Sequence, residues 1–261
     1  MTTNTEPQSS DQAAEERATA IAEFQRRDKW RRRLPLLPAL LFTIVVTQIP
    51  FLFNIWFSLQ DWRIVPPRGP DFVGLENYTE GYSNPFFLDA VWISIGMTTA
   101  AVLLSLVVGT GLALLLDRQF FGRGIARTLL ITPFLVMPVV AGLLWKNQIF
   151  SSTFGVLNAV IETFGFEAIP FVERYPFWAI VTVLVWQWSP FMMLIVLAGL
   201  QSQPTEILEA ARVDGASSNG IFFHITLPLL RPYLELGILL GSIYIIQVFD
   251  HVEVITGGGP G

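Results

Sequence analysis

The sequence predicts an all-α membrane protein with five transmembrane helices, and two observations support this fold class. Of its 261 residues, 52% are hydrophobic and 14% are charged, whereas a soluble domain usually carries about 25% charged residues. Five continuous apolar runs also reach the roughly 20 residues that an α-helix needs to cross the hydrocarbon core of a bilayer. These runs lack the alternation of polar and apolar residues that is typical of barrel strands.

The composition also excludes several classes of function. A chain this apolar is neither a soluble globular enzyme nor a disordered protein. Its net charge is −5 and its basic residues cluster only near the N-terminus, which argues against binding to nucleic acid. The absence of cysteine excludes disulfides and thiolate ligands, and the two histidines offer few imidazole ligands for a metal site. We therefore expect no metal and no cofactor in this chain.

The chain begins with a polar segment, residues 1–33, which we interpret as a cytoplasmic N-terminal tail. The remainder, residues 34–261, is expected to form one transmembrane domain. Prolines should bend two of its spans, the third at Pro133 and Pro138 and the fourth at Pro190. The five spans are expected at residues 34–59, 91–116, 128–150, 177–200 and 232–255.

The distribution of Arg and Lys predicts the orientation of these spans. Six basic residues lie between residues 26 and 33, directly before the first span. If that end is cytoplasmic, the arginine-containing loops after the second and fourth spans are cytoplasmic too. The first apolar run is longer than the 7–15-residue core of a signal peptide, so we expect a retained anchor in a multi-pass protein.

With five spans, the C-terminus is expected on the outer side, where the sequence ends in a flexible turn at residues 256–261. We interpret this as a chain cut short before a sixth span. Between the third and fourth spans, residues 155–166 are expected to form an amphipathic helix on the outer surface, because apolar side chains recur there at helical spacing.

The loop at residues 201–231, between the fourth and fifth spans, is the most informative stretch. Pro204 is typical of a position near a helix start, and Gly215 is expected to end that helix with a positive φ. A second short helix should begin near Ser217 and stop before Leu227. The sequence therefore predicts a cytoplasmic helix–turn–helix whose alanine-rich surface lets another protein approach closely.

This loop resembles the EAA motif of bacterial ABC importer permeases, in which Glu-Ala-Ala, a glycine, an isoleucine and Leu-Pro stand at fixed spacings. The chain from about Pro35 onward is similar to this family. The resemblance implies a type I ABC importer permease core, for which six spans are expected, in the bacterial cytoplasmic (inner) membrane. The matching residues, with two that extend the match to Asp-Gly-Ala, are Glu209, Ala210, Ala211, Gly215, Ile225, Leu227, Pro228, Asp214 and Ala216.

The resemblance also implies partners, because in this family the loop is the coupling helix that docks in a cleft of the ATPase subunit. We expect an ABC ATPase dimer that holds ATP and Mg, a second permease subunit, an extracytoplasmic substrate-binding protein and membrane lipid. Neither Lys29 nor Lys146 stands in a P-loop pattern. ATP hydrolysis is therefore assigned to a separate subunit, and this chain is expected to hold no catalytic residue and to work by alternating access.

Three further stretches resemble the carbohydrate branch of the maltose-transporter type. They are residues 186–191, 197–201 and 248–250, the last followed by a Gly-Gly-Gly-Pro turn. The pattern is most similar to permeases for sugar alcohols such as sorbitol or mannitol. The resemblance implies import of a sugar or sugar alcohol.

Polar and aromatic residues inside the fourth and fifth spans are candidates for a substrate path, because a carbohydrate is bound by ring stacking and by hydrogen bonds to its hydroxyls. Successive helix positions point about 100° apart, so Trp186 and Trp188 do not easily line one narrow path. For either ring the alternative is helix packing or contact with lipid, and Gln187 and Gln247 are the stronger candidates. The full set is Trp186, Gln187, Trp188, Tyr244, Gln247 and Asp250.

Several charged residues have structural alternatives. Asp250 and Glu253 could pair with Lys146 or meet a partner outside the membrane. Glu235, just inside the fifth span, is expected to make an interfacial or inter-subunit polar contact. His224 is expected to pack or to lie on the surface.

Other classes of function stay open at this point. A secondary transporter could use Asp250, His251 and Glu253 as a proton or sodium relay, but these residues lie near the outer edge and no inverted repeat is visible. An ABC permease for another small solute, such as an amino acid, a peptide or a phosphate ester, is the alternative within the family. A membrane-embedded enzyme would need a carboxylate pair, a metal cluster or a nucleophile–base pair, and the sequence offers none.

Overall fold

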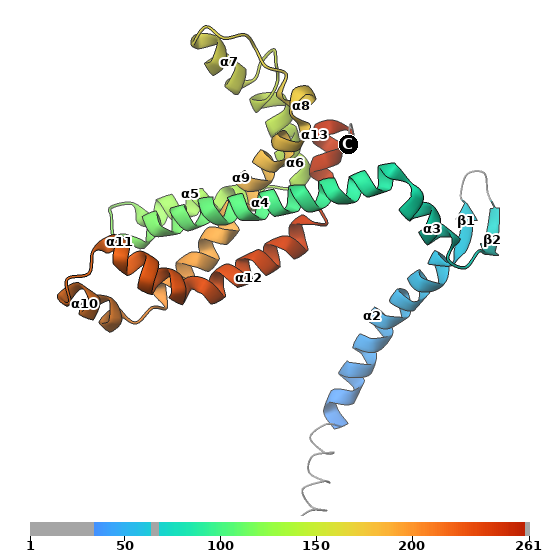
Figure 1. Ribbon diagram of the computed structural model, residues 1–261, viewed down its shortest axis with the longest axis horizontal. Coiled ribbons are helices and arrows are strands. Elements are labelled where there is room, and N and C mark those ends of the chain that lie inside the picture. Colours follow the sequence, from blue (N-terminus) through green and yellow to red (C-terminus); the bar gives the residue numbers. More distant parts are fainter. Residues whose placement is uncertain (1–33, 64–67, 259–261) are drawn as a thin grey trace, which may run out of the picture. The chain divides into compact units, whose positions relative to one another are not determined.

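A computed structural model describes residues 34–63 and 68–258, and the chain divides after Asn84 into two compact units that are described separately (Figure 1). The tail predicted over residues 1–33 lies outside the described residues, as does the end of the turn predicted over residues 256–261. The described elements are helices, apart from one two-stranded hairpin.

The first unit contains the first predicted span. A 3-10 turn, Leu34–Leu36, leads into α2, Leu37–Ser58, which confirms the helix expected at residues 34–59. No residue of α2 is buried within the described structure, so this helix presents apolar side chains on all sides.

The first unit ends in a small ordered loop. The hairpin pairs β1, Gln60–Arg63, with β2, Arg68–Phe72, in antiparallel fashion, and the helix α3, Glu76–Ser83, follows. The Asn77 side-chain amide donates to the carbonyl oxygens of Ser58 and Gln60 at 2.9 and 3.0 Å. One side chain thus holds α3 against the start of the hairpin.

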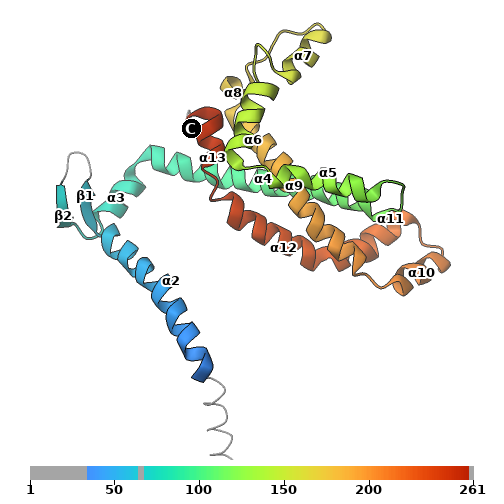
Figure 2. The same ribbon diagram turned by 180° about the vertical axis from the view of Figure 1, so that it is seen from behind.

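The second unit is built from helices and two π-helical segments. The helices α4, α9 and α12 pack against one another, with α10 and α11 at one end of this group and α6, α8 and α13 at the other (Figure 1 and Figure 2). In chain order the bounds are α4 Pro85–Asp117, α5 Arg123–Leu135, α6 Pro138–Leu144, a π-helical segment Trp145–Ile149, α7 Val156–Thr163, α8 Phe171–Arg174, α9 Pro176–Gln201, α10 Thr205–Val213, α11 Ser218–Ile221, a π-helical segment Phe222–Thr226, α12 Leu227–Ile245 and α13 Asp250–Thr256.

The central helix of this unit is α9. In its most apolar stretch 61% of the residues are buried, compared with 33% for α4. Gly109 allows α4 to approach it, because a Cβ built there would lie 2.6 Å from the Met192 Cβ and 2.8 Å from the Met193 backbone nitrogen. The two helices therefore meet backbone to backbone, as small residues permit in membrane helices.

α12 packs closely against α9 at two further glycines, one on α9 and one on α12 itself. A Cβ at Gly199 of α9 would lie 2.7 Å from the Tyr233 ring of α12, and a Cβ at Gly241 of α12 would lie 2.4 Å from the Met192 methyl carbon. Neither position has room for a larger residue without movement of its neighbours. These contacts join α4, α9 and α12 into one close-packed core.

By length and apolarity, four described helices are candidate membrane spans, or five if the bent pair α5–α6 counts as one. α9 confirms the fourth predicted span, and Pro190 lies inside it without ending it. α4 confirms the second span but begins at Pro85, earlier than expected. The amphipathic helix expected at residues 155–166 is confirmed as α7.

The third predicted span, residues 128–150, is not a continuous helix. α5 and the helix that begins at Pro138 meet at an angle of 99°. Val136 and Met137 between them are extended, with ψ of 133° and 135°. For Met137 the cause is Pro138, since a proline disfavours helical geometry in the residue before it. The expected bend at Pro138 is thus a complete break, while Pro133 stays inside α5.

The fifth predicted span, residues 232–255, is wrong at both ends. The helix begins earlier, since α11 and the second π-helical segment continue without interruption into α12. It stops at Ile245, where the Val248 N–H turns back to the Ile245 carbonyl and the Gln247 side-chain amide donates to the Ile243 carbonyl. α13 is therefore a separate short helix.

Candidate functional site

The loop at residues 201–231 folds around a tight turn at Gly215. The Gly215 N–H donates to the Arg212 carbonyl at 3.1 Å, and the Ala216 N–H donates to the Ala211 carbonyl at 3.0 Å. Together with the φ of +80° at Gly215, these bonds form a Schellman motif, which satisfies the last carbonyls of a helix. Gly215 ends α10 as predicted.

The second half of the loop begins at Ser217, whose Oγ accepts a hydrogen bond from a backbone N–H three residues later and caps α11. The prediction that this helix stops before Leu227 is wrong. Pro228 is the second residue of α12 and lies just after the π-helical segment Phe222–Thr226, so the helix continues through this proline where its hydrogen-bond pattern is already irregular. The Gln203 side chain donates to the Thr226 carbonyl at 3.1 Å and ties the entry of the loop to the π-helical segment.

The nine residues proposed for coupling differ in exposure. Two other residues of α10, Ile207 and Val213, are not among the nine and are 45% and 88% exposed. Apolar side chains therefore lie beside the small residues of the turn. A partner protein could cover these side chains. The exposed members of the nine are Glu209, Ala210, Asp214, Gly215, Ala216 and Pro228, and the partly buried members are Ala211, Ile225 and Leu227.

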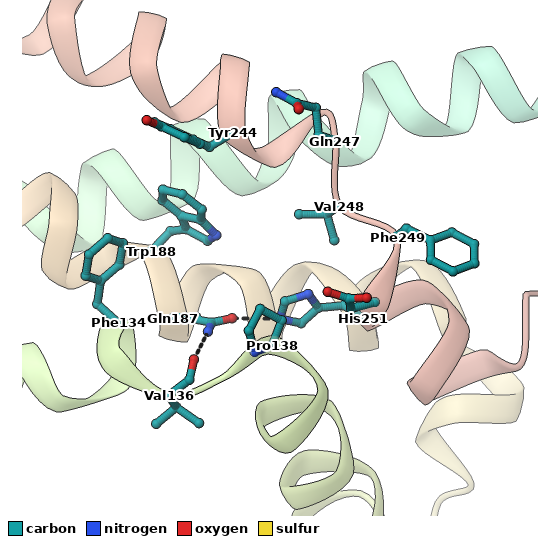
Figure 3. A pocket seen from close by; sticks show the side chains of 11 residues that line it. Phe134, Val136, Pro138, Gln187, Trp188, Tyr244, Gln247, Val248, Phe249 and His251 are labelled. Atoms are coloured by element: carbon teal, nitrogen blue, oxygen red, sulfur yellow. Dashed lines mark hydrogen bonds between the residues drawn. The ribbon is translucent and has the colours of Figure 1, made fainter.

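A cavity of about 470 Å³ lies where α9, the end of α12 and the break between α5 and α6 meet. Five of the six predicted path residues line it: Gln187, Trp188, Tyr244, Gln247 and Asp250 (Figure 3). The structure therefore brings together side chains from two predicted spans. The other lining residues are Phe134, Val136, Pro138, Val248, Phe249 and His251.

Trp186 does not line the cavity. Its ring meets the Trp145 ring edge-on at 5.7 Å between centroids, so it packs against the π-helical segment Trp145–Ile149. The expectation that Trp186 and Trp188 point apart is confirmed. For Trp186 the packing alternative describes what the structure shows.

The aromatic wall of the cavity is a small cluster of rings. Trp188 and Tyr244 are stacked at 5.7 Å with an interplanar angle of 24°. Phe134 meets Trp188 edge-on at 5.5 Å. Tyr244 is 55% exposed, so this wall combines a packed ring with an open one, an arrangement that offers an apolar face to a ligand.

Gln187 is buried, and both polar atoms of its side chain contact protein groups. Its Nε2 donates to the Val136 carbonyl at 2.6 Å, and its Oε1 lies 2.7 Å from the His251 Nε2 (Figure 3). The Val136 carbonyl is available because the helix breaks there. Gln187 thus links three segments of the chain, a role that the sequence reasoning did not include.

Three expected contacts involve charged residues. Lys146 makes no ion pair among the described residues, and its Nζ donates instead to the Val254 carbonyl at 3.0 Å. Glu235 pairs with Arg231 one turn earlier at 2.7 Å, with both side chains exposed, and its contact with another subunit stays a prediction. His224 is exposed, as expected.

Comparison with known proteins agrees with this architecture. Residues 101–261 match the protein family described as binding-protein-dependent transport system inner membrane component. The chain is 34% identical over 231 residues to the trehalose/maltose transport system permease protein MalF of Thermococcus litoralis, covering 87% of this chain and 77% of that protein. It is 31% identical over 249 residues to the trehalose transport system permease protein SugA of Mycobacterium tuberculosis strain H37Rv, covering 93% and 80%.

The fold is similar to that of solved transporters. A chain of a bacterial alginate ABC transporter, crystallised with an alginate pentasaccharide-bound periplasmic protein, superposes with a TM-score of 0.71 at 19% identity, covering 88% of this chain and 77% of that one. The overall fold of this chain is therefore shared with a chain of a known ABC transporter. This chain is a member of the family of binding-protein-dependent transport system inner membrane components, the permease subunits of ABC transporters.

Proposed function

We propose that this chain is a permease subunit of an ATP-driven ABC importer that moves a sugar or sugar alcohol across the inner membrane by alternating access. The observation that carries the proposal is the placement of two features on the same pair of helices. α9 and α12 are joined at one end by the exposed turn at Gly215, and both contribute side chains to the cavity. A movement of the turn can therefore be transmitted through α9 and α12 to the side chains that line the cavity.

The turn is proposed to dock on the ATPase subunit. The small residues Ala210 and Ala216 and the exposed side chain of Val213 support this assignment, because they leave room for a partner and offer it apolar surface. An ATPase dimer presents two such docking places, so a second permease subunit, identical or different, belongs to the proposal. An extracytoplasmic binding protein and a cytoplasmic N-terminus complete it.

The cavity is proposed to lie on the substrate path. Stacked rings of Trp188 and Tyr244 offer apolar faces, and the Gln247 amide and the Asp250 carboxylate offer hydrogen-bonding groups. Sugars and polyols need both kinds of contact. The relatives named for trehalose and maltose support a sugar as the first substrate class to test, with sorbitol and mannitol beside it.

The test combines purification with transport. The tagged full chain is purified in mild detergent from its own host, the co-purifying proteins are identified by mass, and their ATP hydrolysis is measured. Uptake of labelled trehalose, maltose, sorbitol and mannitol is measured in cells. Uptake that survives ATP depletion while a proton gradient persists would contradict an ABC importer and favour the gradient-driven alternative.

Two glycine variants make the test specific for the loop. Gly215 and Gly165 have φ of +80° and +82°, and at each a Cβ would meet no atom within 4 Å. Valine at either position strains the backbone by a similar amount, roughly 1–2 kcal/mol. We expect Gly215→Val to lose co-purification of the ATPase and at least tenfold in uptake, while Gly165→Val keeps both. Wild-type uptake in Gly215→Val would contradict the proposed coupling.

A further inference from the structure

The short helix α13 is docked on the broken span instead of continuing α12. The Lys146 Nζ donates to the Val254 carbonyl at 3.0 Å. Gly142 of α6 leaves room for Val254, since a Cβ there would lie 3.0 Å from the Val254 Cγ1 and 3.2 Å from its Cβ. The side chain of His251 reaches Gln187 of α9 at 2.7 Å. α13 therefore touches both α6 and α9.

One amide sets the polarity of this contact. The Gln187 Nε2 donates to the Val136 carbonyl, which can only accept, so Oε1 is the Gln187 atom that faces His251. Because Oε1 also only accepts, the His251 Nε2 must carry a hydrogen. The Gln187 side chain on α9 thus contacts both the α5–α6 break and α13, and fixes their positions relative to α9 (Figure 3).

The docked arrangement carries a free-energy penalty. The Nδ1 of His251 is buried and has no hydrogen-bond partner within the part of the chain that the structure describes, and an unpaired buried polar atom is destabilising. If α13 moved away, water in the cavity could reach this nitrogen. Residues 246–249 between α12 and α13 are not helical, so α13 is not a rigid continuation of α12.

The platform under α13 has an irregular backbone as well. Lys146 lies in the π-helical segment Trp145–Ile149, and such segments are frequent at functional sites. The contact therefore joins an irregular backbone segment, a few directed bonds and one unsatisfied atom.

We propose that α13 is a latch on the wall of the cavity, docked in one state of the transport cycle and released in the other, and that Gln187 is the positioning residue that sets the docked state. His251 and Asp250 of α13 line the cavity, so release opens that wall. The inference rests on the proposed function, because the two states are those of the transporter.

This chain contains no cysteine, so one engineered pair can report the state of the latch without a competing thiol from the same chain. In Gly142→Cys/Val254→Cys the two Cβ atoms start 3.2 Å apart in the docked state, close to the roughly 3.5–4.5 Å of a disulfide. The variant is assembled with its ATPase, second permease and binding protein in nanodiscs. Disulfide formation is timed without nucleotide and with ATP and vanadate.

We expect the rate of disulfide formation to differ at least fivefold between these conditions. The oxidised complex should lose more than 90% of its binding-protein-stimulated ATP hydrolysis, and dithiothreitol should restore it. The single variants Gly142→Cys and Val254→Cys control for crowding, and oxidation should not change the ATP hydrolysis that each of them shows under reducing conditions. Equal rates in both conditions, or full hydrolysis by the oxidised pair, would overturn the latch.

Gln187 is tested in the same cysteine background. Gln187→Leu, which removes both hydrogen bonds, should slow disulfide formation at least threefold without nucleotide. Gln187→Glu keeps an acceptor for His251 and should lie between leucine and wild type. An unchanged rate in Gln187→Leu would overturn its role as the positioning residue. If the cysteine-free complex itself fails to assemble or to hydrolyse ATP, the proposed function fails first, and the latch fails with it.

Discussion

The close approach of α4 to α9 at Gly109 makes a sharp prediction about stability. In Gly109→Ala the new Cβ would stand 2.6 Å from the Met192 Cβ and 2.8 Å from both the Met193 nitrogen and the Ser189 carbonyl oxygen. Contacts begin to be ordinary at 3.4 Å, so the backbones must separate by about 0.8 Å, the difference between 3.4 and 2.6 Å. Two of the three atoms belong to the backbone of α9 and cannot rotate away.

The magnitude follows from overpacking. Extra methylenes in a packed core cost about 1–3 kcal/mol, and a rigid backbone neighbour favours the upper end. Alanine recovers roughly 0.5–1 kcal/mol over glycine inside a helix, which leaves a net loss of about 2 kcal/mol. For a chain of this size that corresponds to a fall of about 4–8 °C in Tm. Gly111→Ala, on the same helix with no atom within 4 Å, should be neutral or slightly stabilising.

The assay is thermal stability in detergent, read as the fraction of monodisperse protein that remains after heating. The comparison of Gly109→Ala with Gly111→Ala removes the effect of helix propensity, because both replace glycine by alanine in α4. A Tm for Gly109→Ala equal to or above that of Gly111→Ala would refute the close contact between α4 and α9. The reasoning about the glycine-lined core would then fail as a whole.

Three further outcomes are expected. Gln187→Leu leaves the Val136 carbonyl and a histidine nitrogen unpaired and should lower stability by about 1–3 kcal/mol, measured as Tm in detergent. Trp188→Ala should raise the KM for sugar uptake about two- to tenfold, because ring stacking contributes about 0.5–1.5 kcal/mol. Trp186→Ala should lower Tm with little change in KM, and the reverse pattern would exclude Trp188 from the path. Glu235→Gln breaks only an exposed pair with Arg231, worth about 0.3–0.5 kcal/mol, so a Tm shift above about 4 °C in the assembled transporter would reveal a contact with another subunit.

The sequence located the spans that are continuous, predicted only a bend where the third span breaks before Pro138, and missed the end of α12 at Ile245. α2, α4 and α9 follow from long apolar runs, since one run of this kind has only one way to cross a bilayer. The end of α12 at Ile245 could not be predicted in the same way, because Ile246, Val248 and Phe249 directly after it are still apolar, and at the interruption the Gln247 side chain bonds back to its own helix. Apolar content alone does not report such a local competition.

The candidate site shows the same division. Trp188, Tyr244 and Gln247 were found because polar and aromatic residues within spans are few. His251 was missed as a wall residue, since its partner Gln187 lies 64 positions away in sequence. Val136 was missed because it contributes a backbone carbonyl, and the Met137-Pro138 step was the one sequence signal for it.

The glycine contacts of α4, α9 and α12 also decide where this molecule is stiff. Because α4 and α9 meet backbone to backbone at Gly109, neither helix can move there without the other. A displacement of α10 is therefore transmitted along α9 over the 14 residues from Gln201 to Gln187, or about 21 Å. Two segments lack such close glycine contacts and can change conformation more easily. They are the extended step at Val136 and the four residues that follow α12. Deformation is therefore concentrated around the cavity, where these two segments lie, and a small rotation there changes the width of the cavity opening.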